Sequence, residues 1–235
     1  MKTTRREFIP FSFYDHTGME KHLEKMARKG WMVEELSNTI WRYRKIEPKT
    51  LHFSISFDVR ASEFAPEPTE EQVTFQEFCA RSGWKLAAAS GRMQVFYNEE
   101  EDPLPIQTDP EMEVRMVGKL ARRAVPAYVV LLVLGFLLGG GWCASLISTP
   151  IKALTTPGGV LVGLSWLCLF LYGAADLIVY YTWRHRALAA AQRGEFLPTR
   201  GCHELLYVVL AAIALGLVYW FAVERRPDRK STRLN

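Results

Sequence analysis

The sequence predicts an α+β N-terminal domain followed by an all-α transmembrane bundle of three predicted spans. Two observations carry this prediction. A Gly-Trp pair occurs at Gly30-Trp31 and, 53 positions later, at Gly83-Trp84, each time where a helical pattern stops. Long apolar runs without a charge fill much of the second half of the chain. The expected division is 1–100 (soluble domain), 101–124 (linker and juxtamembrane helix), 125–226 (transmembrane region) and 227–235 (non-native tail).

The soluble domain is predicted to consist of two βαββ repeats, over residues 5–47 and 51–98. The segment LHFSISFDV, which begins at Leu51, alternates apolar and polar side chains as a half-buried strand does. After each Gly-Trp pair the sequence predicts two short strands, because GWMVEELSNTIWRYRK aligns without a gap with GWKLAAASGRMQVFYN. Two such units predict an antiparallel sheet with both helices on one face.

Each repeat carries signals for the start and the end of its helix. Capping boxes are expected at Thr17-x-x-Glu20 and at Thr69-x-x-Gln72. A glycine then supplies the left-handed residue that closes each helix, and the tryptophan after it packs back on the helix. The predicted helix-cap anchors are Gly30, Trp31, Gly83 and Trp84.

The region between the repeats and the first span is predicted to be a linker followed by a helix. Acidic residues and prolines in EEEDPLPIQTDPEM, which starts at Glu99, interrupt the strand pattern. Asp109 followed by Pro110 is typical of an N-cap and first helical position. The helix is expected to run toward the first span, with Pro126 disturbing it.

Three spans are expected at about 125–146, 158–182 and 205–223. Lys and Arg residues precede the first span and follow the second, so the positive-inside rule predicts a cytoplasmic N-terminal domain in a multi-pass protein of the cell membrane. Three spans leave the basic C-terminal segment outside, which conflicts with that rule. The final residues, DRKSTRLN, look like translated sequencing-adapter DNA, so we interpret the tail after about Pro227 as foreign and allow for a missing fourth span.

Small residues recur four positions apart within the spans and predict close helix packing, within one bundle or through a possible oligomer face. The predicted packing pairs are Gly135 with Gly139 and Gly159 with Gly163, together with Ala212 and Gly216. Asp176 is the acidic residue well inside a span and is a weak functional candidate. We interpret it as an interfacial group that reaches water or a basic partner; the alternative is a proton or ion relay.

The sequence contains no recognisable catalytic, metal-binding or cofactor-binding motif, so we expect no enzyme activity, no metal and no cofactor. HELLY at His203 lacks the second histidine of a zinc motif, and the five histidines are expected at surface or capping positions. The four cysteines show no CxxC spacing. The first 123 residues are nearly neutral, with 19 basic and 20 acidic side chains, so no nucleic-acid partner is expected. The ligand is unknown.

The segments FIPFSFYDHTGMEKHLEKMARKGWMVEE, WRYRKIEPKTLHFSISF and FCARSGWKLAAASGRMQVFYNEEEDPLPIQTDP resemble the uncharacterised bacterial family called domain of unknown function 2812. The resemblance covers about residues 3–115. It implies a membrane protein, often encoded beside a PadR-type regulator, with a role in a regulated membrane or envelope response. No catalytic residues are implied.

These observations favour a membrane-anchored cytosolic binding or regulatory module, active in an envelope-stress or transport response. The expected partners are the lipid bilayer and another membrane or regulatory protein. The alternative is an accessory subunit of a membrane transporter, in which the helical bundle is the working part.

Overall fold

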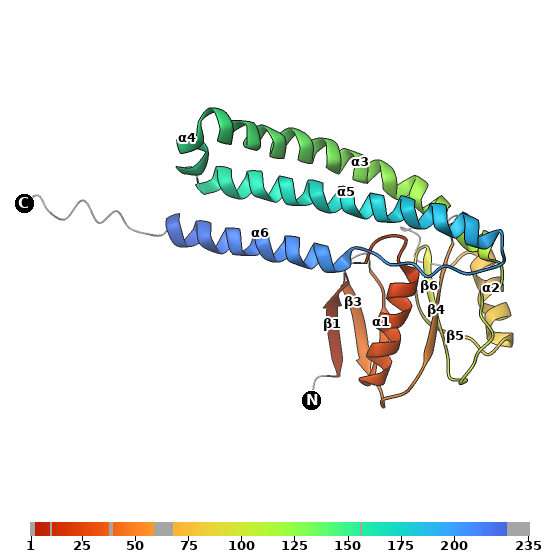
Figure 1. Ribbon diagram of the computed structural model, residues 1–235. Helices are drawn as coiled ribbons and strands as arrows, with labels where there is room; N and C mark the ends of the chain where they lie inside the picture. The colour runs from red at the N-terminus through yellow and green to blue at the C-terminus, as the bar shows by residue number, and fades with distance from the viewer. Residues whose placement is uncertain (1–2, 10, 38–39, 59–67, 156, 225–235) are drawn as a thin grey trace, which may run out of the picture. The chain divides into compact units, whose positions relative to one another are not determined.

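A computed structural model gives the structure of residues 3–9, 11–37, 40–58, 68–155 and 157–224 (Figure 1). The chain divides into two compact units that are discontinuous in sequence. We call residues 1–123 with 179–201 the head, and residues 124–178 with 202–235 the helical unit. The head therefore includes the stretch predicted as linker and juxtamembrane helix, up to residue 123, and also residues 179–201, which were expected within the transmembrane region. The tail predicted at 227–235 lies outside the described residues.

The head contains two antiparallel three-stranded sheets built from the same order of elements. The first sheet has the order β1-β3-β2 and the second the order β4-β6-β5. A helix follows the first strand of each set, α1 (His16–Arg28) after β1 and α2 (Glu70–Arg81) after β4. The strands are β1 (Thr4–Phe8), β2 (Trp31–Glu35), β3 (Ile40–Lys45), β4 (His52–Phe57), β5 (Lys85–Ser90) and β6 (Met93–Asn98).

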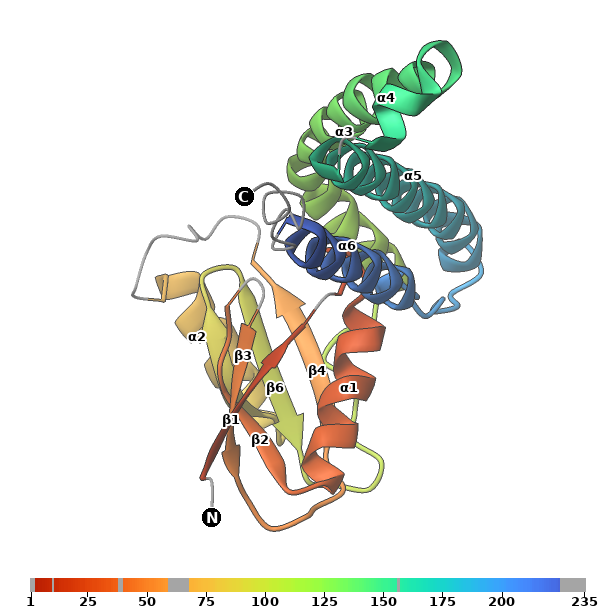
Figure 2. The ribbon, with the colours of Figure 1, turned by 90° about the vertical axis from the view of Figure 1, so that its left-hand side faces the viewer.

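The prediction of one sheet with both helices on one face is wrong in two respects. The strands form two sheets, with β2 beside β5 where they meet. The helices cover opposite faces, as the neighbouring residues Val95 and Phe96 of β6 show. Val95 packs in the main core with Leu23 of α1, whereas Phe96 packs with Cys79 of α2. Successive strand residues point to opposite faces, so the strands lie between α1 and α2 (Figure 2).

The two helices of the head begin differently. Thr69 and Gln72 form the expected capping box at the start of α2, with both reciprocal hydrogen bonds present. In α1 the N-cap is Asp15, whose side chain accepts a hydrogen bond from the backbone of Gly18 at 3.1 Å. The expected capping box at Thr17 is therefore wrong. Because Asp15 caps the helix, the side chain of Thr17 is free to bond elsewhere in the head.

Both helices end at a glycine in the left-handed region. Gly30 has φ of +79° and Gly83 has φ of +84°, and residues other than glycine rarely adopt these backbone angles. After α2, Trp84 N–H donates to the carbonyl of Cys79 at 3.0 Å, and the two side chains share a small core with Phe96. Trp31 packs at the edge of the main core.

The head is completed by the last turns of the second long helix, α5 (Pro157–Ala191), and by the segment that follows it. Trp183 donates from its indole nitrogen to the carbonyl of Leu197 at 3.1 Å. Thr199 and Thr17 exchange two hydrogen bonds. The aromatic rings of Trp183 and Tyr14 are stacked, with centroids 6.3 Å apart. Residues 179–201 thus form an integral layer of the head.

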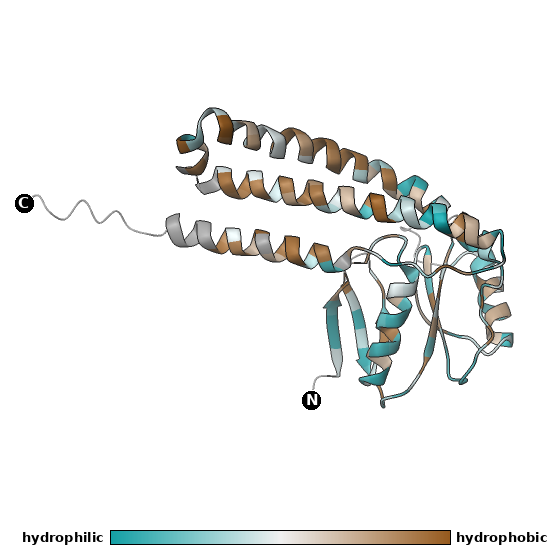
Figure 3. Cartoon of the chain, viewed as in Figure 1, coloured by the Kyte–Doolittle hydropathy of each residue, from teal (hydrophilic) through white to brown (hydrophobic). Residues whose placement is uncertain are grey.

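The remaining helices, apart from the short α4 (Pro150–Thr155), are long and largely apolar (Figure 3). The long ones are α3 (Pro110–Ser148), α5 (Pro157–Ala191) and α6 (His203–Glu224). Among the described residues, α3 and the segment Gly159–Ala191 of α5 are long and apolar enough to cross a membrane, whereas the apolar part of α6 is shorter. Asp109 accepts a hydrogen bond from the backbone of Glu111 at 2.8 Å at the start of α3, which continues without interruption past Pro126.

Glycines bring the helices of the helical unit close together. A Cβ atom at Gly135 would lie 2.8 Å from Cβ of Phe170, and one at Gly139 would lie 3.0 Å from the backbone nitrogen of Leu167. Gly163 of α5 lies directly against the ring of Trp142 of α3. The close approach of α3 and α5 therefore depends on positions without a side chain.

Candidate functional site

A cavity of about 470 Å³ lies within the head. It is lined by α1, by the edge strand β4, by the linker before α3, by the first turns of α3 and by the segment after α5. Its polar lining residues include His16, Glu20, Glu24, His52, Asp102 and Glu113. Cavities of this size that combine apolar walls with a few convergent polar groups are typical of small-molecule sites.

A buried ion pair between His16 and Glu113 forms one wall of the cavity. Nε2 of His16 lies 2.9 Å from a carboxylate oxygen of Glu113, and Nδ1 lies 3.2 Å from the carbonyl oxygen of Tyr14. Both partners are acceptors, so the imidazolium form satisfies both contacts. Burial alone lowers the pKa of His16, but the hydrogen bond that it donates to Glu113 and the charge of Glu20 raise it overall.

Glu20 lies one helical turn from His16 and faces the same cavity. One of its carboxylate oxygens accepts a hydrogen bond from the backbone N–H of Ile55 at 2.9 Å. Burial raises the pKa of Glu20 to about 7, against the lowering effect of the His16 charge. The side chain therefore exchanges its proton near neutral pH, which is unusual for a carboxyl group.

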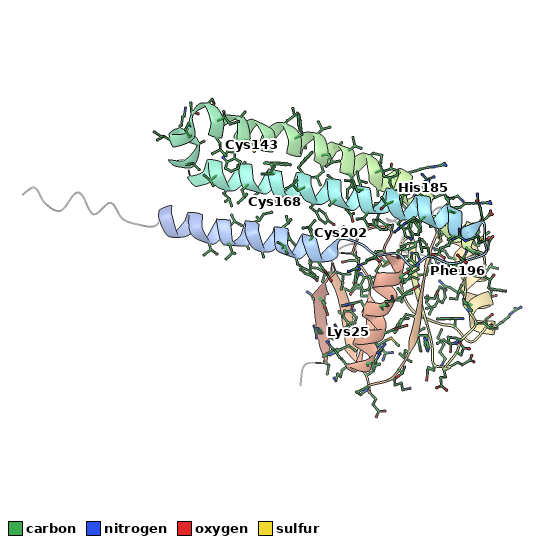
Figure 4. All side chains as sticks on the ribbon, in the orientation of Figure 1. Lys25, Cys143, Cys168, His185, Phe196 and Cys202 are labelled. Atoms are coloured by element: carbon green, nitrogen blue, oxygen red, sulfur yellow. The ribbon has the colours of Figure 1, made fainter. Side chains whose placement is uncertain are left out.

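The remaining walls are aromatic and aliphatic. Trp84 is held by a hydrogen bond from its indole nitrogen to the carbonyl of Leu104 at 2.8 Å, and it lines the cavity from the position immediately before β5. Phe196, labelled in Figure 4, comes from the segment after α5 and is 47% exposed. Outside the ion pair, Nδ1 of His52 lies 3.9 Å from a carboxylate oxygen of Glu24.

The residues singled out in the sequence contribute unequally to this site. Trp84 lines the cavity, whereas Gly30, Trp31 and Gly83 do not. The expectation that all histidines lie at the surface or at caps is wrong for His16, which is 8% exposed. Its partner Glu113 is 97 positions away in the sequence, so no local pattern signals the pair.

Asp176 lies in the helical unit and is completely buried. The hydroxyl of Tyr128 on α3 donates to its carboxylate at 2.8 Å. This differs from the expected interfacial group that reaches water. The contact joins α3 to α5 through a polar pair between apolar helices.

A metal centre finds no support in the described ranges, which contain no group of three or more His, Cys, Asp or Glu side chains placed to hold an ion. The four cysteines all lie among the described residues and form no disulfide. Acid–base groups and apolar walls are therefore the chemistry that the cavity offers.

Comparison with known proteins gives one match. Residues 15–130 match the model of a family described as Protein of unknown function (DUF2812). No curated protein and no solved structure matches the chain. The matched range includes the lining residues contributed by α1, β4, the linker and α3, but not those that follow α5.

Proposed function

The chain belongs, over residues 15–130, to the family of unknown function DUF2812, and we propose that it is a membrane-anchored module whose cytoplasmic head binds a small ligand. The family description assigns no activity, so the proposal rests on the geometry of the head. The cavity beside Glu20 is the observation that carries it.

The exposure of the long helices supports membrane anchoring. Only 11% of the most apolar stretch of α3 and 28% of that of α5 are buried within the protein. The core helix of a soluble protein is mostly covered by its own chain, so these apolar surfaces need another environment, which lipid provides. We include α6 as a third span, since its mean hydropathy is high although its apolar part is shorter.

The positions of the basic residues beside the predicted spans support a cytoplasmic location of the head. The basic residues before the first span and those after the second belong to the same compact unit, so both must lie on the same side of a membrane. This agrees with the positive-inside rule, which assigns both segments to the cytoplasm. The residues concerned are Lys119, Arg122, Arg123, Arg184, Arg186, Arg193 and Arg200.

Cysteine labelling tests this topology. All four native cysteines are replaced by alanine, and single cysteines are introduced by Glu71→Cys on α2, Arg193→Cys in the head and Ile151→Cys on α4. We expect a membrane-impermeant maleimide to label intact cells at position 151 alone, and to label the two head positions only after permeabilisation. Labelling of either head position in intact cells contradicts the proposal.

Ligand binding is tested on the full chain, because a fragment that ends near residue 115 lacks residues 179–201 of the head. Ser54→Trp places a large ring in the cavity, and Thr74→Trp on the exposed face of α2 is the matched control. Native mass spectrometry of protein extracted from its host in mild detergent should show a bound small molecule in the wild type and the control, but not in Ser54→Trp. Equal occupancy in all three, or none in any, contradicts binding in this cavity.

A further inference from the structure

We propose that the ligand of this cavity is an organic cation with an apolar body, whose positive charge is neutralised by the carboxylate of Glu20. This inference rests on the proposed function and names the class of ligand. It follows from the charge of the lining, from the partners of each lining carboxylate and from the aromatic walls.

The lining carries a strong excess of acidic groups. Four of the lining residues are carboxylic acids, two are histidines, and none is lysine or arginine. A concave site lined by one sign of charge with apolar walls concentrates ligands of the opposite sign. An anionic ligand would meet repulsion from every ionised carboxylate in the cavity.

The partners of these carboxylates show which of them is available. Glu113 is paired with His16, Glu24 lies near His52, and Asp102 is exposed to solvent. Glu20 has one oxygen bonded to the backbone of Ile55, and its second oxygen accepts no hydrogen bond from the described side chains and backbone. Glu20 is half-buried, and a carboxylate that is partly withdrawn from water and lacks a full set of donors gains from a cationic partner.

The groups around Glu20 determine the pH range in which its side chain is ionised. It faces His16 on its own helix, Glu113 of α3, Glu24 one turn further along α1, and His52, Ser54 and Ser56 of β4 across the cavity. Burial raises the pKa of Glu20 to about 7, so at neutral pH a large fraction of the side chain is protonated. A bound cation favours the ionised form, so binding releases a proton.

The apolar walls fit the rest of such a ligand. Trp84, Phe53 and Phe196 supply aromatic rings, and prolines of the linker and of the segment after α5 close the lining. Aromatic faces attract quaternary ammonium groups and also cover hydrocarbon. A volume of about 470 Å³ accommodates a phenylalkyl ammonium ion but not a polypeptide.

The test compares three probes that share a phenylalkyl body: trimethyl(3-phenylpropyl)ammonium, 3-phenylpropanol and 4-phenylbutyrate. Their binding to the full chain is measured by isothermal titration calorimetry in phosphatidylcholine nanodiscs, whose zwitterionic lipids do not attract the cation. At pH 8 we expect the ammonium ion to bind at least tenfold more tightly than the alcohol, and the carboxylate most weakly. Equal affinity for the ammonium ion and the alcohol would overturn the inference.

The role of Glu20 is tested separately. Lowering the pH from 8 to 6 should weaken binding of the ammonium ion about tenfold, because protonation of a group with a pKa near 7 then competes with the cation. Glu20→Gln keeps an acceptor for Ile55 and should remove both the charge preference and most of this pH dependence. Glu77→Gln, on the exposed surface of α2, is the matched control and should bind as the wild type does.

A second variant guards against misfolding of Glu20→Gln. Phe196 is half-exposed, so Phe196→Ala should fold, and it should weaken binding of the ammonium ion severalfold. Unchanged affinity in both variants overturns the assignment of this cavity to a cation. The proposed function fails separately: it is contradicted when native protein carries no molecule that Ser54→Trp displaces, whatever the probes do.

Discussion

Thr17 and Thr199 exchange two hydrogen bonds across 182 positions of the sequence. The N–H of Thr17 donates to the hydroxyl of Thr199 at 3.0 Å, and the N–H of Thr199 donates to the hydroxyl of Thr17 at 3.1 Å. This reciprocal pair joins the first turn of α1 to the segment that follows α5. Both elements line the candidate ligand cavity, so the pair fixes the position of one wall relative to another.

Removing either hydroxyl should destabilise the head. Thr17→Val and Thr199→Val keep the shape of the side chain but leave the partner backbone N–H without an acceptor, at a cost of about 1–3 kcal/mol each. Hydrogen exchange of the segment after α5 measures the effect in the full chain. Thr74→Val, which alters an exposed hydroxyl on α2, is the control, and protection equal to that of the control would contradict the role of the pair.

The stability of the head should fall as the pH rises through neutrality. The pKa of Glu20 is raised from 4.5 to about 7 by burial, and the pKa of His16 is also raised overall. Groups whose folded pKa is raised contribute stability that is complete below the unfolded pKa and is lost as the pH rises through the folded value. Chemical unfolding of the full chain at pH 5 and pH 8 should show this loss.

Replacement of Glu20 isolates its share of that pH dependence. Glu20→Gln cannot ionise, so above pH 7 it should be more stable than the wild type by on the order of 2 kcal/mol. Near pH 4 the two proteins should be equally stable, because the wild-type side chain is then neutral. A constant difference at all pH values would show that packing rather than ionisation causes the change.

Adding one methyl group at the contact between α3 and α5 should disrupt the helical unit. Gly163→Ala places a Cβ atom into the ring of Trp142, whereas Gly140→Ala and Gly141→Ala meet nothing within 4 Å. The first variant should lower the thermal unfolding midpoint in detergent. The two controls should be neutral or slightly stabilising, since alanine favours a helix over glycine by about 1 kcal/mol. Equal behaviour of all three would argue against close packing at Gly163.

The buried pair in the helical unit should depend on its hydroxyl. Tyr128→Phe removes the donor to Asp176 and leaves a buried carboxylate with one partner fewer, which should cost about 1–3 kcal/mol. Adding Asp176→Asn to this variant should recover part of the loss, because an amide is less costly to bury than a charge. Thermal unfolding in detergent compares these variants with Tyr181→Phe, whose ring is half-exposed.

Much of the head could be predicted because its signals are local. The alternation of β4 and the strand pairs after each Gly-Trp come from neighbouring residues, and the structure contains the predicted order of strands and helices. The opposite faces of α1 and α2 could not be predicted from helix periodicity alone. The available signal was the pair Val95 and Phe96, since adjacent apolar residues in a strand indicate burial on both faces.

The candidate site could not be predicted because its groups come from distant parts of the chain. Glu20 was assigned to a capping box, a local role that Asp15 fulfils instead. His16 meets Glu113 only once α3 has packed, and Phe196 arrives from beyond the second long helix. The spacing of residues in the sequence predicts contacts within one helix or strand, but it does not predict contacts between distant parts of the chain.

The split of the head across the chain has a consequence for biosynthesis. Tyr14 is fully covered in the finished protein, partly by Tyr180 and Trp183. Those partners lie in the last turns of α5, so they are synthesised only after α3 and most of α5, a delay of roughly ten seconds at a translation rate of about 5–20 residues per second. During that interval Tyr14 lacks the two aromatic partners that pack on it in the finished protein. The head can therefore complete its folding only after α3 and α5 have been synthesised.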